Sequence, residues 1–144
     1  MDIRRLVSGD EAHAQAMIVT MAEVFEQPYK LLEAPYLQRL LARPDFWAVA
    51  AFDGDEIVGG LTAYTLAMTR SETAELFIYD IAVRVDRQRQ GIGRALMEGL
   101  LSMAEREGIK VTFVPAENED THALDFYHAL GGDAAAVTIF TYTR

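Results

Sequence analysis

The chain has 144 residues, of which 51% are hydrophobic and 24% charged, and it contains no cysteine. This favours one compact domain over residues 1–144 and excludes a disulfide framework, a thiolate metal site and a cysteine nucleophile. The formal net charge of −9 at pH 7 argues against nucleic acid, because phosphate contacts need the opposite sign. Without a signal-peptide core or an apolar stretch of membrane-spanning length, we expect a cytoplasmic protein that does not bind membranes.

The N-terminal third is predicted to form a short strand and two helices. Residues 2–7 have the mixed character of an opening strand. Apolar residues then keep helical spacing to about residue 26, with Ser8 as the expected N-cap and Glu11 completing a capping box. A second helix is predicted over Ala34–Ala42, because a proline in its first turn is favourable and Pro44 stops the pattern.

Three strands are expected next, as an antiparallel meander. Phe46–Phe52 and Glu56–Leu66 are apolar runs joined by Asp53-Gly54-Asp55, which is a hairpin signal. Gly59-Gly60 within the second run predicts a bulge or a close approach by other atoms. The third strand is predicted over Thr73–Val83.

The remaining elements alternate between helix and strand. A helix is predicted from Ile92 to about residue 107, with Gly108 as its C-terminal cap. A strand at Lys110–Val114, a helix at Thr121–Leu130 and a closing strand at Ala136–Tyr142 follow. Strand, helix and strand in succession imply a right-handed crossover and a parallel pair, so we expect an α/β fold.

A glycine loop, Gly91-Ile92-Gly93, lies between the third meander strand and the long helix. Glycines let backbone amides approach a ligand, and unpaired N–H groups at a helix start attract phosphate. Four arginines surround it: Arg84, Arg87, Arg89 and Arg94. A P-loop would need Gly-Lys-Ser/Thr after the glycines and a dinucleotide loop would need glycine at Arg89, which leaves an anion site or an ordinary tight turn.

Gln88-x-x-Gly91-x-Gly93 resembles the coenzyme A pyrophosphate loop of the GNAT-type N-acetyltransferases, and Ala123-x-x-x-Tyr127-x-x-x-Gly131 is similar to their second coenzyme A segment. The resemblance covers nearly the whole chain. It implies a central mixed, mostly antiparallel sheet, splayed between its fourth and fifth strands and flanked by helices, with acetyl-coenzyme A in the cleft. The implied coenzyme-binding residues are Ile81, Ala82 and Val83 for the pantetheine arm and Gln88, Arg89, Gln90, Gly91, Ile92, Gly93 and Arg94 around the pyrophosphate.

Residues 44–64 and 77–83 further resemble the aminoglycoside 3-N-acetyltransferases of type I, the gentamicin/fortimicin group. Tyr79-Asp80 before Ile-Ala-Val carries most of this likeness, because most other relatives have no carboxylate there. A charge in an apolar strand is costly unless it is paired or faces a ligand. Asp80 therefore forms either an ion pair with a nearby arginine or part of a substrate site.

Acetyl transfer needs a deprotonated amine, a polarised thioester carbonyl and a proton for the departing thiolate. Asp80 is the first candidate for handling the amine proton, which requires a relay or a raised pKa, and Glu117 is the second. By resemblance Tyr127 is the general acid; packing in the core is the alternative. The expected substrate-binding residues are Tyr79, Asp80, Glu117, Asn118, Glu119 and Asp120, with Glu72 and Glu75 near them.

The main hypothesis is direct transfer, in a ternary complex, from acetyl-coenzyme A to an aminoglycoside amine, at position 3, conferring antibiotic resistance. The acidic loop 117–120 suits such a polycationic substrate. The alternatives are acetylation of another small amine such as a polyamine, acetylation of a protein amine, and a non-catalytic coenzyme-A-binding sensor. We predict no metal site, because His13, His122 and His128 form no cluster in the sequence, and the resemblance allows a homodimer.

Overall fold

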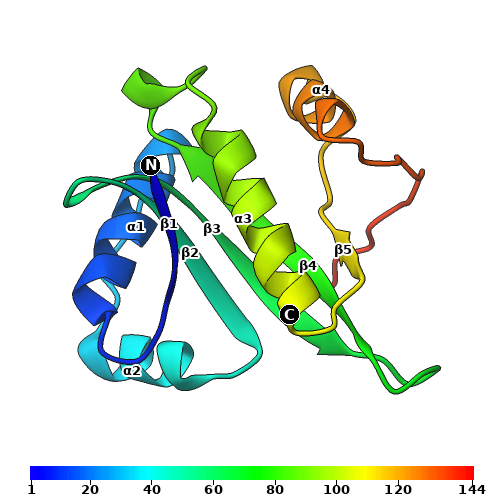
Figure 1. Ribbon diagram of the computed structural model, residues 1–144, viewed down its shortest axis with the longest axis horizontal. Coiled ribbons are helices and arrows are strands. Elements are labelled where there is room, and N and C mark those ends of the chain that lie inside the picture. The colour runs from blue at the N-terminus through cyan, green and yellow to red at the C-terminus, as the bar shows by residue number, and fades with distance from the viewer.

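The computed structural model describes residues 1–144 and contains five strands, four α-helices and one short 3-10 helix (Figure 1). In chain order they are β1 (Asp2–Leu6), α1 (Glu11–Val24), α2 (Ala34–Ala42), β2 (Phe46–Asp53), β3 (Glu56–Ala67), β4 (Ala74–Val83), η1 (Val85–Arg87), α3 (Ile92–Arg106), β5 (Val111–Phe113) and α4 (Thr121–Ala129). None of the helices combines the length with the apolar character that a membrane crossing requires.

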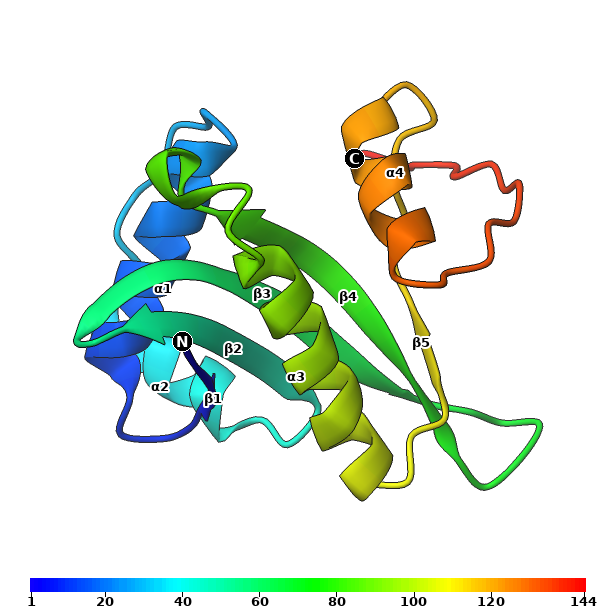
Figure 2. The same cartoon turned by 45° about the horizontal axis from the view of Figure 1, so that its top comes forward.

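The strands form one sheet in the order β1-β2-β3-β4-β5, antiparallel throughout except for the parallel pair β4 and β5. That pairing ends early, at Phe77 opposite Phe113. Beyond this point β4 continues to Val83 while the chain after β5 turns toward α4 (Figure 2). The expected mixed sheet with a split between its fourth and fifth strands is confirmed.

Alternating side chains of β2 supply both layers of the core, which explains why this strand is apolar throughout. Trp47, Val49 and Ala51 join the cluster that includes the buried residues of α3. Phe46, Ala48, Ala50 and Phe52 join the cluster that includes the buried residues of α1 and α2. The period of two in a strand sends successive side chains to opposite faces, so α3 covers one face of the sheet and α1 with α2 covers the other.

The glycine pair in β3 confirms the predicted irregularity and close approach. The register between β2 and β3 shifts at Ala51 and Phe52, opposite the glycine pair. A side chain at Gly60 would collide with Met17 of α1, and a Cβ at Gly59 would lie 2.9 Å from the carbonyl oxygen of Ala82. These two positions therefore let α1 and β4 pack directly against the backbone of β3.

The start of α1 differs from the predicted capping box. The N-cap is Asp10, not Ser8, and the Asp10 carboxylate accepts a hydrogen bond from the backbone N–H of Val7 at 2.8 Å. Glu11 accepts from the N–H of Gly9, whose φ of +103° makes a tight turn before the helix. This local turn competes with the capping box, and it starts the helix later in the chain.

The predicted closing strand is also absent. Residues 136–142 form no strand, and no residue after Gly132 takes part in a hydrogen bond between backbone groups. β5 is likewise shorter than predicted, with three residues rather than five. A strand pattern records side-chain preference, whereas a strand requires a neighbour with which to exchange hydrogen bonds, and this segment has none within its own chain.

Candidate active site

The split in the sheet leaves one edge of β4 open over the residues that the sequence predicts for the coenzyme. Ile81, Ala82 and Val83 pair with Leu61, Gly60 and Gly59 of β3 on one side. On the side of β5 they face no strand, because the parallel ladder has already ended. Backbone groups along such an edge can hydrogen-bond an extended ligand that carries amides, as an added strand would.

The glycine loop presents a run of free backbone donors at the start of α3. Arg89 and Gly91 have φ values of +64° and +81°, and Gly91 is the N-cap of the helix without a side-chain cap. The first intrahelical bond runs from the N–H of Ala95 to the carbonyl of Gly91 at 3.0 Å, and the N–H groups from Arg89 to Arg94 donate to no backbone acceptor. Free amides at a helix N-terminus make a site for an anionic ligand.

Three of the four arginines around the loop have acidic partners. Arg84 binds Glu56 and Asp86, Arg87 lies 2.6 Å from Asp53, and Arg94 lies 3.3 Å from Glu98. Arg89 forms no ion pair and is exposed beside the free amides. The positive charge at the loop therefore comes chiefly from Arg89 and from the helix terminus.

The Gln88 side chain ties the loop to the sheet. Its Nε2 donates to the carbonyl oxygen of Val83 at 3.0 Å, which fixes the position of the loop relative to the end of β4. Gln88 thus has a structural contact in addition to the role that the resemblance implies.

Helix α4 closes over the loop because Gly93 has no side chain. A Cβ there would lie 3.2 Å from two ring atoms of Phe126 on α4. Asp120 is the N-cap of α4 and accepts a hydrogen bond from the N–H of Ala123 at 3.1 Å. One oxygen of the predicted substrate ligand Asp120 is therefore engaged in capping.

Tyr127 lies on α4, half-buried against the core cluster on the α3 face and in edge contact with Phe126 at 5.2 Å between ring centroids. The ring of Tyr127 packs as the core interpretation predicts, and its hydroxyl forms no hydrogen bond within the protein, so the role of general acid stays a prediction. Burial, followed by the nearby charge of Asp120, raises the pKa of the Tyr127 phenol. The hydroxyl consequently stays protonated at neutral pH and is suited to donating a proton.

Asp80 lies at a β-bulge that the sequence did not reveal. Thr62 pairs with Asp80 and the next residue pairs with Ile78, so Tyr79 is the extra residue on β4. Ile78 and Ile81 both belong to the α3 face. The bulge therefore directs Tyr79 and Asp80 to the opposite face, the side of α1 and α2.

Asp80 forms no hydrogen bond and no ion pair, and partial burial raises the pKa of its carboxyl group. The proposed ion pair with a neighbouring arginine is wrong, because Arg84 and Arg87 bind Glu56, Asp86 and Asp53. A half-buried carboxylate without a partner is costly in a folded protein and is a mark of functional sites.

A row of aromatic rings crosses the sheet beside Asp80. The ring centroids of successive neighbours lie 5.2 to 6.2 Å apart, and the row consists of Phe46, Tyr64, Tyr79, Phe77 and Phe113. The sequence does not predict Phe77 and Phe113 as site residues, because only the pairing of β4 with β5 brings them together. Tyr79, in the middle of the row, is 63% exposed, so the row offers an aromatic surface to a ligand there.

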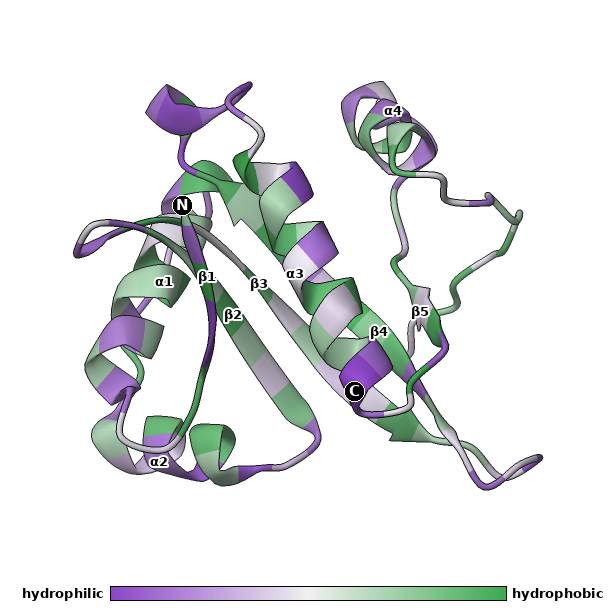
Figure 3. Ribbon diagram, in the orientation of Figure 1, coloured by the Kyte–Doolittle hydropathy of each residue, from purple (hydrophilic) through white to green (hydrophobic).

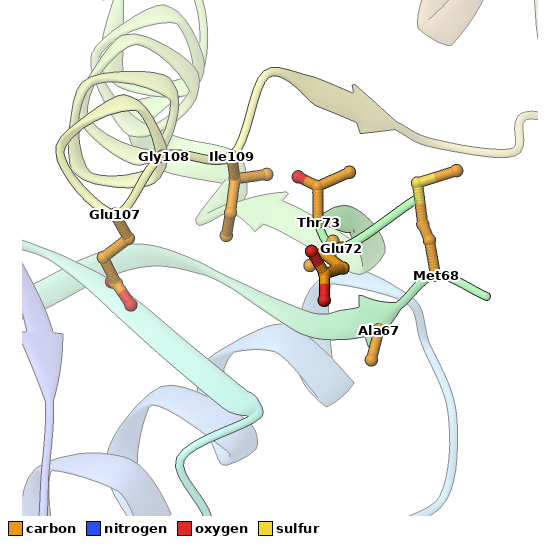
Figure 4. A pocket seen from close by; sticks show the side chains of 8 residues that line it. Ala67, Met68, Glu72, Thr73, Glu107, Gly108 and Ile109 are labelled. Carbon is orange, nitrogen blue, oxygen red and sulfur yellow. The ribbon is translucent and has the colours of Figure 1, made fainter. Parts of the chain in front are cut away.

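The acidic loop follows β5, so Glu117, Asn118 and Glu119 lie beyond the split and are exposed. Glu72 and Glu75 are not near them: Glu75 pairs with Val111 at the start of β5, and Glu72 lines a separate hollow at the opposite end of β4 (Figure 4). That expectation is wrong, because parallel β4 and β5 carry the loop away from the start of β4.

Comparison with known proteins agrees with this architecture. The family model described as the acetyltransferase (GNAT) family matches residues 14–131. The crystal structure of an aminoglycoside acetyltransferase from an uncultured soil metagenomic sample, in complex with sisomicin, is 34% identical, with a TM-score of 0.95 over 99% of this chain and 95% of that one. A second aminoglycoside acetyltransferase from such a sample is 32% identical, with a TM-score of 0.90 over 99% of this chain and 98% of that one.

Among curated proteins, the ribosomal protein bS18-alanine N-acetyltransferase of Escherichia coli is 33% identical over 79 residues, which is 55% of this chain and 52% of the relative. The chain thus spans about half the length of the curated relatives it matches. The family match covers most of the chain, including the open edge of β4, the free amides of the glycine loop and helix α4. This chain therefore belongs to the GNAT family of acetyltransferases.

Proposed function

We propose that this protein transfers an acetyl group from acetyl-coenzyme A to an amine of an aminoglycoside antibiotic, by direct attack in a ternary complex. The observation that carries the proposal is the placement of an unpaired carboxylate, Asp80, on the same stretch of β4 whose open edge leads to the free amides of the glycine loop. The N-terminus of helix α3 can bind an anion, and the Asp80 carboxylate on the preceding strand β4 can bind a cation. This pair suits an anionic acetyl donor and a cationic acceptor.

The residues fit acetyl-coenzyme A, which serves as the acetyl donor in this family. In the proposal, backbone groups of Ile81–Val83 bond the amides of the pantetheine arm along the open edge of β4. The N–H groups from Arg89 to Arg94, with the unpaired Arg89 guanidinium, bind the diphosphate. The N–H groups from Arg89 to Arg94 have no backbone acceptor and the Arg89 guanidinium has no ion-pair partner within the protein, which supports their assignment to a ligand.

Asp80 receives the amine in this mechanism. Its carboxylate bonds the substrate ammonium and takes the amine proton, directly or through water, while Glu117 stays the second candidate for that role. The raised pKa makes Asp80 a better base than an ordinary aspartate. The free amine then attacks the acetyl carbon, a C–N bond forms, and the C–S bond breaks.

Tyr127 completes the proton balance. In this proposal its hydroxyl donates a proton to the departing thiolate, so the products are the acetylated amine and the free thiol of coenzyme A. The raised pKa keeps the phenol protonated until that step. Asp80 releases its proton to solvent, and the second proton, which leaves the nitrogen as the amide forms, returns to the phenoxide through solvent.

An aminoglycoside is favoured over other amines by two observations. The solved relative with a TM-score of 0.95 and 34% identity over 99% of this chain is an aminoglycoside acetyltransferase in complex with sisomicin. In addition, Glu117, Asn118 and Glu119 are exposed on the loop that follows β5, and Asp120 has one oxygen outside its capping bond, so this loop offers several acceptors. Such acceptors suit a substrate with several ammonium groups. Position 3 of the deoxystreptamine ring and a resistance phenotype are part of this proposal.

A protein N-terminus is the second candidate, because the curated relative is an alanine N-acetyltransferase acting on a ribosomal protein. That match covers about half of each chain, whereas the aminoglycoside acetyltransferase match covers nearly all of both.

The test measures thiol release from acetyl-coenzyme A with three acceptors: sisomicin, spermidine and a peptide that begins with alanine. We expect kcat/KM to be largest for sisomicin, and NMR of the product to show acetylation of the 3-amino group. Faster turnover of the peptide would overturn the assignment in favour of a protein acceptor. Tight binding of coenzyme A without turnover of any amine would identify a sensor.

A further inference from the structure

The turn of the β2–β3 hairpin is bound to the segment that leads into the glycine loop. Arg87, the last residue of η1, lies 2.6 Å from Asp53 at the end of β2. Arg84 binds Glu56 at the start of β3, and its backbone N–H donates to the carbonyl oxygen of Val58 at 2.8 Å. In Figure 3 the turn of the hairpin and the segment that contains η1 are both hydrophilic. Two ion pairs and a backbone hydrogen bond therefore join parts of the chain that are distant in sequence.

The two arginine head groups are held on more than one side. Arg84 also binds Asp86, with nitrogen–oxygen distances of 2.6 and 2.9 Å. The Nε of Arg87 donates to the side-chain oxygen of Gln90 at 3.3 Å, directly before Gly91. The exposed fractions of the two arginine side chains are 31% and 21%. Both guanidinium groups are thus matched by protein acceptors and largely covered.

The residues after η1 adopt a backbone conformation that needs support. Arg89 and Gly91 have φ values of +64° and +81°. The left-handed conformation is unfavourable for a residue with a Cβ, such as Arg89, so it persists only where the surrounding structure holds it. Gln88 is fixed to the end of β4, and Arg87 is fixed to the hairpin by Asp53. The hairpin therefore supplies one of the two attachments that precede the free amides.

We propose that Arg84 and Arg87 are positioning residues of the coenzyme site and not ligands of the diphosphate. Through Glu56 and Asp53 they hold the chain before the glycine loop, so that the free N–H groups are arranged before the ligand binds. Donors that are already ordered bind an anion more tightly, because less conformational freedom is lost on binding. The inference rests on the proposed binding of acetyl-coenzyme A at the glycine loop and divides the surrounding arginines by role.

The role of Arg87 as a positioning residue or as a ligand leads to opposite expectations for Asp53. If Arg87 binds the diphosphate, removing the Asp53 carboxylate frees a cation and takes a negative charge away from an anionic ligand, so the affinity should rise. If Arg87 positions the loop, the same substitution releases the loop from the hairpin, so the affinity should fall. The sign of the change therefore distinguishes the two roles.

The first test measures acetyl-coenzyme A binding by isothermal titration calorimetry, and turnover with the best acceptor of the intact protein. We expect Asp53→Asn to raise the Kd and the KM for acetyl-coenzyme A about 5-fold, with kcat changed by less than about twofold. The matched control is Asp55→Asn, because Asp55 is exposed in the same turn and forms no hydrogen bond or ion pair; its Kd should equal that of the intact protein. An unchanged or lower Kd for Asp53→Asn would overturn the proposal.

The second test exchanges the two charges. Arg87→Asp alone should raise the Kd for acetyl-coenzyme A, because two acids then face each other. The Arg87→Asp/Asp53→Arg double variant restores an ion pair of reversed polarity and should recover most of the lost affinity. If Arg87 contacts the diphosphate, an aspartate at this position repels the ligand even in the double variant. A double variant that binds as weakly as Arg87→Asp would therefore refute the positioning role.

The intact protein separates failure of this inference from failure of the proposed function. No binding of acetyl-coenzyme A by the intact protein would overturn both. Binding by the intact protein, with the same Kd in Asp53→Asn, would overturn the positioning role alone. Circular dichroism of each variant checks that it is folded, and the double variant decides the question if Asp53→Asn unfolds.

Discussion

Asp80 combines features that seldom occur together in a purely structural residue. It lies in a strand whose neighbours are apolar, is half-buried, and has neither a hydrogen bond nor an ion pair. The bulge at Tyr79 directs its side chain away from α3. The residue therefore costs stability in the free protein, and in the proposed function this cost is offset when the substrate ammonium binds.

Replacing Asp80 by Asn should lower kcat for sisomicin by about 100-fold or more, because the amine loses its proton acceptor. The substitution should also change the pH dependence of stability. The pKa of the Asp80 carboxyl is higher in the folded protein than in the unfolded chain. At a pH between these two pKa values, the folded protein therefore binds more protons than the unfolded chain does. The contribution of Asp80 to the free energy of unfolding consequently falls as pH rises through the native pKa. The variant should lack that fall.

Urea unfolding between about pH 4 and pH 8 measures this difference, with the intact protein as the reference. The expected outcome is that Asp80→Asn is at least as stable as the parent at the higher pH. A marked loss of stability there would instead indicate an ion pair made by Asp80.

Replacing Tyr127 by Phe separates packing from proton donation, because the ring and its contact with Phe126 are retained. We expect kcat to fall about 10- to 100-fold while the KM for acetyl-coenzyme A stays nearly constant. Since the pKa of Tyr127 is raised, the parent enzyme should show no loss of this acid until above about pH 10. Tyr36→Phe, on exposed Tyr36 of α2, is the control; equal effects of both variants would remove Tyr127 from the mechanism.

At the scale of elements, helix α3 joins the anion site to the core. Its buried residues Ile92, Leu96 and Leu100 anchor it on the sheet, and its N-terminus is left with free amides. Gly91 and Gly108 flank the helix at its two ends, with φ values of +81° and +78°. A Cβ added at either position would have no other atom within 4 Å. They therefore form a matched pair that differs in location only.

Gly91→Ala and Gly108→Ala should each cost about 1 to 2 kcal/mol of unfolding free energy, because both impose a left-handed conformation on alanine. Only Gly91→Ala should weaken acetyl-coenzyme A binding, since it disturbs the amides that we assign to the diphosphate. Chemical denaturation and isothermal titration calorimetry measure the two quantities. Equal affinities for the two variants would contradict the assignment of the loop.

At the scale of the whole molecule, charge is divided between two regions. The chain carries a formal net charge of −9, while the unpaired Arg89 and the start of α3 form a local positive site. This division suits two ligands of opposite charge that meet at the split in the sheet.

Raising the salt concentration from about 20 mM to about 300 mM should increase the KM for sisomicin several-fold, because the attraction between exposed charges is screened. The kcat should change less, since the reacting groups are already in contact. An osmotically matched series with sucrose is the control. A KM for sisomicin that does not respond to salt would argue against the acidic surface as the substrate site.

Much of the fold could be predicted from sequence because its signals are local. Helix α2 matches its predicted bounds at both ends, since proline in the first turn and the Arg43-Pro44 stop act within a few residues. The β-hairpin at Gly54 and the free amides before α3 likewise follow from glycines that adopt positive φ.

Other features depended on which groups meet in space. Whether Asp80 had a partner was decided by the acids that bind Arg84 and Arg87, and these come from other parts of the chain. The bulge at Tyr79 and the aromatic row arise from the register between strands. The strand predicted at residues 136–142 failed for the same reason, because composition encodes a preference for β structure, but hydrogen bonds to a neighbouring edge create the strand.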